Sequence, residues 1–182
     1  MKTKSLGFIG GGRITRIFLQ AFTNKKVIFE SISVFDTNPE ILQDLKQKFP
    51  FIQILDSASE AARKDIVFLA LHPPVIIDTL EKIKTDVSEQ TIFVSLAPKI
   101  TIEKIRMSLS PVRQIIRMIP NATSVINHGF NPVCFTPEMS KVQKQYMIEM
   151  LNLLGRTLET SEEKMEAYAL LSAMLPTYFW YQ

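Results

Sequence analysis

Three consecutive glycines near the N-terminus are the first residues whose type and spacing point to chemistry. The segment GFIGGGRITRIF (residues 7–18) places them between a short apolar run and a helical pattern. There, Gly10 allows a tight turn and Gly12 lets helix N-terminal amides approach a diphosphate. Glycine clusters also form ordinary turns, but the flanking strand and helix favour a dinucleotide cradle. The candidate cofactor contacts are Ile9, Gly10, Gly11, Gly12, Arg13 and Ile14.

An acidic residue follows the second apolar run, ISVF (32–35). A carboxylate at this strand end, Asp36, can accept hydrogen bonds from an adenosine ribose, and it repels a 2′-phosphate. Neither Thr37 nor Asn38 supplies a cation that would hold such a phosphate. Asp36 and Thr37 are therefore candidate cofactor contacts that favour NAD over NADP. The alternative is that Asp36 only caps the helix that begins near Pro39.

The next two strand ends add further candidates. LALHPP (69–74) ends a buried run, and open α/β sheets bind ligands at the carboxyl ends of their strands. Three roles for His72 stay open: a cofactor contact, an ordinary polar strand-end residue, or a general acid. TIFVSLAPKI (91–100) places residues 95–99 at the next strand end, toward the nicotinamide half of the expected crevice, although Lys99 also fits a solvated loop. The candidate cofactor contacts here are Ala70, Leu71, His72, Pro73 and Ala97.

The remaining elements support these placements. Short runs rich in Ile, Val and Phe alternate with helical patterns, and runs apolar on both faces suit parallel strands covered by helices. The predicted fold class is α/β, a Rossmann-like doubly wound, mainly parallel sheet. Strands are predicted at 6–9, 32–35, 65–71, 91–96 and 114–119, and helices at 14–22, 39–49, 60–64, 75–83, 102–109, 139–155 and 161–175.

The composition changes near residue 160, where the α/β alternation ends and an apolar, aromatic-rich helix begins. We therefore predict a dinucleotide-binding domain at 1–159 and the start of a helical region at 160–182. Glu162 and Glu163 suit a helix start, where solvated carboxylates favour the helix dipole; an acid/base role is the alternative. The aromatic tail beyond Tyr168 predicts a self-association surface, or else a last helix packed on its own domain.

Charge and cysteine content exclude several classes of protein. The formal charge is +3 with a pI near 9.0, but the basic residues are interspersed with acidic ones, so nucleic acid is not an expected partner. Cys134, the single cysteine, is expected to be a buried thiol, and the two histidines lie far apart, so no metal site is expected. No signal peptide or membrane span is predicted, and we expect a cytoplasmic protein.

Five segments together resemble a known family. GFIGGGRI, DIVFLALHPP, FVSLAPKITIEKI, RMIPNATSVINHGFNPV and SAMLPTYFW have the order and spacing seen in pyrroline-5-carboxylate reductases. The resemblance implies a Rossmann domain followed by an all-helical domain that forms a homodimer. It also implies NAD(P)H-dependent hydride transfer to the C=N bond of a small cyclic imine such as 1-pyrroline-5-carboxylate, in proline biosynthesis. Pro120, Asn121 and Ser172 are the candidates for its substrate and nicotinamide pocket.

The chain also departs from that family. Ala169 stands where the family has a threonine, and Ala173 and Leu175 replace two glycines of a Ser-Gly-Ser-Gly loop. Met174 and Leu175 are expected to crowd the approach of a substrate carboxylate. A second hypothesis is therefore a non-catalytic NAD(P)-binding module that acts as a sensor or interaction partner.

Overall fold

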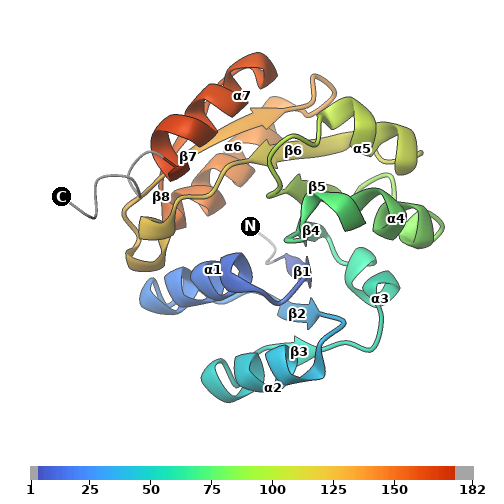
Figure 1. Cartoon of the computed structure of the whole chain (residues 1–182), viewed down its shortest axis with the longest axis vertical. Helices are drawn as coiled ribbons and strands as arrows, with labels where there is room; N and C mark the ends of the chain where they lie inside the picture. Colours follow the sequence, from blue (N-terminus) through green and yellow to red (C-terminus); the bar gives the residue numbers. More distant parts are fainter. Residues whose placement is uncertain (1–3, 175–182) are drawn as a thin grey trace.

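One twisted sheet forms the centre of the molecule, in the strand order β3-β2-β1-β4-β5-β6-β7-β8. The computed structural model describes residues 4–174 (Figure 1). All neighbouring strands are parallel except β6 and β7, so the predicted mainly parallel α/β sheet is confirmed. The strands are β1 Ser5–Ile9, β2 Ser31–Phe35, β3 Gln53–Ile54, β4 Ile66–Leu69, β5 Ile92–Ser95, β6 Gln114–Met118, β7 Gly129–Phe135 and β8 Gly155–Glu159.

Helices cover both faces of this sheet (Figure 1). One apolar core joins the sheet to α1, α2 and α6, and a second joins it to α3, α4 and α5. Helix α7 packs through Met165 on the same side as α5. The helices are α1 Arg13–Asn24, α2 Pro39–Lys48, α3 Ala58–Ala62, α4 Pro73–Ile83, α5 Ile102–Ser108, α6 Lys141–Leu151 and α7 Glu162–Tyr168, with a π-helical continuation at Ala169–Met174.

The strand order fixes where a ligand can lie. From β1 the chain builds outward to β2 and β3, and it then returns to add β4, β5 and β6 on the other side of β1. Connections therefore leave the carboxyl ends of β1 and β4 in opposite directions, which opens a crevice between them. The glycine run follows β1, so the sequence places it at this crevice.

Three strands were not predicted: β3 at one edge of the sheet, and β7 and β8 at the other. Strand β7 contains Asn131 and Pro132, and β8 has the largely polar sequence GRTLE. The two strands pair closely, since a Cβ on Gly155 would lie 2.2 Å from the carbonyl oxygen of Gly129. The helix predicted to run to residue 155 ends at Leu151 and continues as a short 3-10 helix, Asn152–Leu154.

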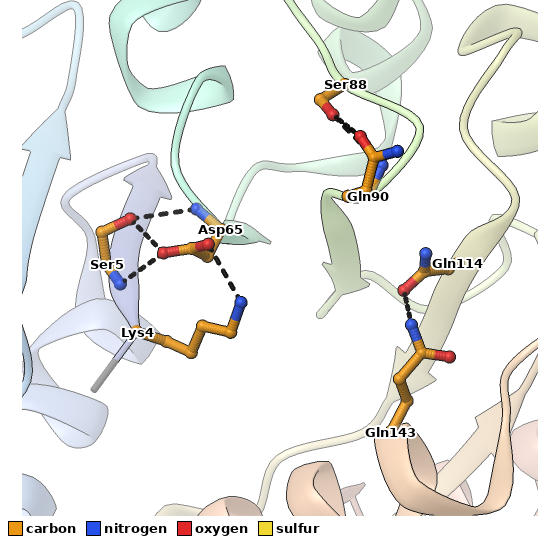
Figure 2. A network of polar contacts seen from close by, with 7 residues as sticks. All are labelled: Lys4, Ser5, Asp65, Ser88, Gln90, Gln114 and Gln143. Carbon is orange, nitrogen blue, oxygen red and sulfur yellow. Dashed lines mark hydrogen bonds and ion pairs between the residues drawn. The ribbon is translucent and has the colours of Figure 1, made fainter. Parts of the chain in front are cut away.

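A polar network joins the amino ends of β1 and β4 (Figure 2). The Asp65 carboxylate accepts hydrogen bonds from the backbone and hydroxyl of Ser5 at 2.9 and 2.7 Å, and from Lys4 Nζ at 3.1 Å. Partial burial alone would raise the pKa of Asp65, but the bonds from Ser5 and Lys4 outweigh it and hold that pKa below its ordinary value.

Because the pKa of Asp65 is lowered in the folded chain, its contribution to stability is present above the ordinary carboxyl pKa and is lost as the pH falls through the folded value. We expect Asp65→Asn to lower the free energy of unfolding by about 1 kcal/mol at neutral pH, a modest value because the site is partly exposed. The difference should shrink below about pH 4. Urea denaturation at both pH values measures it, with the exposed Asp78→Asn as control; an equal loss at both would contradict the charge argument.

Candidate functional site

The glycine run forms a tight turn at the carboxyl end of β1. Gly10 has φ +103°, and a Cβ there would lie 2.4 Å from the carbonyl oxygen of Ala70. Its amide donates to the carbonyl of Phe35 at 2.8 Å, while the buried Thr15 hydroxyl donates to the Gly10 carbonyl. Gly10 is therefore fixed between the ends of β2 and β4, where only glycine fits.

Gly12 differs from Gly10 because its missing Cβ would face open space, with no atom within 4 Å. It is the N-cap of α1, whose first amides have no partner within the helix. A cavity of about 380 Å³ begins at this residue. The room in front of Gly12 and the free amide end of α1 fit a dinucleotide diphosphate.

This cavity collects most of the predicted cofactor contacts. It extends from the start of α1 across the carboxyl ends of β4, β5 and β6. Ile9, Gly10 and Gly11 are buried and do not line it. The predicted cofactor and pocket residues that line it are Gly12, Arg13, Ile14, Ala70, Leu71, His72, Pro73, Ala97 and Pro120. The other lining residues are Leu96 and Pro98, from the segment 95–99 expected at this strand end, together with Ile119 and Ala169.

Asp36 lies beside the glycine turn. One of its carboxylate oxygens accepts the amide of Gly11 at 2.7 Å, and the other accepts the amide of Asn38 at 2.8 Å. The cap of α2 is Asn38, whose side chain accepts the Glu40 amide, so Asp36 does not cap that helix. Asp36 and Thr37 line a separate hollow of about 730 Å³.

The predicted pocket residues beyond β6 form a connected group. Asn121 caps the 3-10 helix Ala122–Ile126, and its side-chain amide nitrogen donates to the carbonyl of Ser172. The backbone amide of Asn121 donates to the buried Asn131 side chain at 3.0 Å. Pro120, the residue before Asn121, lines the cavity. Asn121 therefore connects the π-helical segment Ala169–Met174 to this side of the site.

The sequence interpretation missed an ion-pair cluster next to the cavity. Arg117 of β6 is only 2% exposed, and its guanidinium contacts Glu162 and Glu166 of α7 at 2.8 Å each. Glu162 was interpreted as solvated charge at a helix start, but it also accepts the Ile102 amide at 2.8 Å. Glu166 is itself 47% exposed. Its partial burial favours the neutral acid, yet the bonds from Arg117 and the Lys99 amide hold the pKa of Glu166 below its ordinary value.

Of three other side chains that could take part in chemistry, two are exposed and one is buried. His72 is exposed and is the N-cap of α4, with no side-chain capping bond. Lys99 is exposed in a left-handed conformation with φ +64°. Cys134 is buried as expected, and burial raises the pKa of its thiol.

Within residues 4–174, no group of three or more His, Cys, Asp or Glu side chains is placed to hold a metal ion. The same part of the chain contains no helix long and apolar enough to cross a membrane. Leu175 and the aromatic tail that follows lie outside the described residues, as does the side chain of Met174. The expected crowding of a substrate carboxylate by Met174 and Leu175 therefore stays a prediction.

Comparison with known proteins decides the family. Residues 5–99, just over half of the chain, match the family model described as NADP oxidoreductase coenzyme F420-dependent. The chain belongs to this oxidoreductase family. The pyrroline-5-carboxylate reductase of Corynebacterium melassecola is 25% identical over 177 residues, which are 96% of this chain and 66% of that relative. The resemblance to pyrroline-5-carboxylate reductases is thereby confirmed, and the chain spans slightly less than two thirds of this relative.

Solved structures of family members share the fold. The pyrroline-5-carboxylate reductase of Coxiella burnetii matches with a TM-score of 0.88 and 25% identity, over 100% of this chain and 67% of that one. The pyrroline carboxylate reductase of Plasmodium falciparum, solved with NADP bound, matches with a TM-score of 0.86 and 21% identity, over 100% of this chain and 66% of that one.

Proposed function

We propose that this chain is the NAD(P)H-binding part of a reductase that transfers a hydride to the C=N bond of a small cyclic imine such as 1-pyrroline-5-carboxylate. The observation that carries the proposal is the open space at Gly12, which leads from the amide end of α1 into the cavity beside β4, β5 and β6. The related reductases supply the reaction type and the substrate class.

In this proposal the chain's own residues mainly bind and orient the cofactor and the imine. The first amides of α1 would bind the diphosphate, and Asp36 would accept a hydrogen bond from a ribose hydroxyl. The cofactor, when bound, supplies the hydride. Ala97, Ile119 and Pro120 give the end of the cavity beside β5 and β6 an apolar lining, which would exclude water. Binding of the cofactor and the imine against this lining would hold the reacting groups at close range. His72, at the cavity edge, is an exposed candidate for proton transfer.

We further propose that NAD is preferred over NADP. The supporting observation is the Asp36 carboxylate at the expected ribose position, beside the Gly11 amide. The cationic residue of the same hollow, Lys46, already donates to the carbonyls of Pro50 and Ile52 at 2.9 and 2.6 Å. The Plasmodium falciparum relative holds NADP, so cofactor choice differs within the family if this proposal is correct.

The glycine cradle gives a direct test. We expect Gly12→Val to weaken NADH binding at least about tenfold, or about 1.4 kcal/mol, because the added side chain enters the diphosphate space. The thermal midpoint of unfolding should fall by no more than a few degrees, because valine is a poorer N-cap residue than glycine while no atom lies within 4 Å of the added Cβ. Titration of nicotinamide fluorescence measures the affinity. Unchanged affinity in this variant would show that the cofactor does not use the cradle.

The non-catalytic alternative is favoured by one observation, the apolar Ala169 in the cavity wall where the family has a threonine hydroxyl. An assay with NADH and 1-pyrroline-5-carboxylate separates the two hypotheses. Oxidation of NADH that depends on the imine supports the reductase, and tight NADH binding without turnover supports the sensor or interaction module.

We also propose a homodimer formed through the C-terminal helical region, in the cytoplasm. Leu170 and Leu171, near the end of the described chain, are 48% and 60% exposed, and apolar side chains that follow each other on a helix surface suit an interface. The lone cysteine suits a reducing compartment. The expected partners are a small-molecule substrate and a second copy of the chain, without nucleic acid or a membrane.

A further inference from the structure

We infer that Arg117, Glu162 and Glu166 form a positioning cluster that sets the nicotinamide end of the cavity, while the adenosine end is independent of it. Arg117 Nη1 contacts Glu162 and Arg117 Nη2 contacts Glu166, each at 2.8 Å. The identity of the ligand in this inference rests on the proposed function. The contacts within the cluster rest on the geometry alone.

The cluster joins three segments that each contribute to the cavity wall. Arg117 lies in β6, two residues before Ile119. Glu166 belongs to α7, three residues before Ala169, and it accepts the amide of Lys99, which follows Pro98. Ile119, Ala169 and Pro98 all line the cavity, so one guanidinium and two carboxylates fix the spacing of three walls.

The sheet order identifies this end of the cavity. The glycine turn follows β1, and Asp36 follows β2 on one side of it. Because a dinucleotide extends in opposite directions from its diphosphate, an adenosine beside Asp36 leaves the nicotinamide on the side of β4, β5 and β6. The walls joined by the cluster are on that second side.

The two ends of the described C-terminal segment are attached separately. Arg117 holds the start of α7 through Glu162, and Asn121 holds its π-helical continuation through the carbonyl of Ser172. Arg117 is buried, whereas Glu162 and Glu166 are 32% and 47% exposed. A displaced α7 would leave the buried guanidinium without its carboxylate partners, so the cluster favours one position of α7. Loss of one carboxylate should therefore shift the Ala169 wall without removing the Ser172 attachment.

The test compares two ligands that share the diphosphate and the adenosine. Glu166→Gln keeps the size of the side chain and an acceptor oxygen but removes the charge. The matched control is Glu163→Gln, since Glu163, like Glu166, is exposed on the same helix but belongs to neither ion pair of Arg117. We expect Glu166→Gln to weaken NADH binding about tenfold and ADP-ribose binding less than about twofold, with Glu163→Gln unchanged for both. Equal weakening for the two ligands, or none for either, overturns the inference.

Hydrogen exchange provides a readout that needs no ligand. The amide of Lys99 donates to the Glu166 carboxylate, and an uncharged glutamine is a weaker acceptor, so Glu166→Gln should speed exchange of the Lys99 amide while Glu163→Gln does not. If the wild-type chain binds neither NADH, NADPH nor ADP-ribose, the proposed function fails. In that case faster exchange supports the positioning cluster, and unchanged exchange overturns it.

Discussion

Gly10→Ala should lower the free energy of unfolding by about 3 kcal/mol. Two costs add at this position: the left-handed φ of +103°, and the 2.4 Å approach of a Cβ to the Ala70 carbonyl oxygen. The obstacle is backbone, so no side chain can rotate away. Urea denaturation measures the loss, and we expect NADH binding to disappear with the turn.

The matched control for this prediction is Gly12→Ala, two residues later in the same turn. Its Cβ meets no atom within 4 Å and its φ of −70° suits alanine, but alanine is a poorer N-cap residue than glycine, so we expect a loss of less than about 1 kcal/mol. Equal destabilisation by the two substitutions would contradict the assignment of Gly10 to the turn and Gly12 to the ligand space.

The elements around the cradle could be predicted because their signals are local. Gly10 and Gly12 stand between an apolar run and an amphipathic helix, and the five strands that were predicted, β1, β2, β4, β5 and β6, are rich in buried apolar residues. The strand ends then follow from the known geometry of parallel sheets, which is why His72 and Ala97 could be assigned to one cavity. Pro120, which lines the same cavity, was assigned only through the resemblance to the reductase family.

The parts that could not be predicted depend on contacts between distant segments. Strand β7 carries Asn131 and Pro132, which interrupt its apolar run, and it forms because β6 and β8 pair with it on both sides. Arg117 is a charge inside the apolar run QIIRMI, which signals a buried ion pair. Its partners lie 45 and 49 residues away, so no local spacing identifies them.

Asp36→Asn should shift the ratio of NADPH to NADH affinity at least about tenfold toward NADPH, or about 1.4 kcal/mol. Two unit charges 4 Å apart repel by about 4 kcal/mol at an effective dielectric constant of 20, so removing the carboxylate charge suffices for this shift. The size of the side chain is kept, but asparagine has one acceptor oxygen, so one of the amides of Gly11 and Asn38 loses its acceptor and the other keeps an uncharged one. We expect a stability loss of about 1 kcal/mol.

The control for this substitution is Asp56→Asn. Asp56 lines the same hollow, so its substitution removes the same charge there, away from the glycine turn. If both substitutions shift the ratio equally, the effect comes from net charge and not from a ribose contact of Asp36. If the wild-type chain already binds NADPH more tightly than NADH, the cradle stands and the NAD preference is wrong. A shift confined to Asp36→Asn assigns cofactor selection to the carboxylate that the Gly11 amide holds at the end of β2.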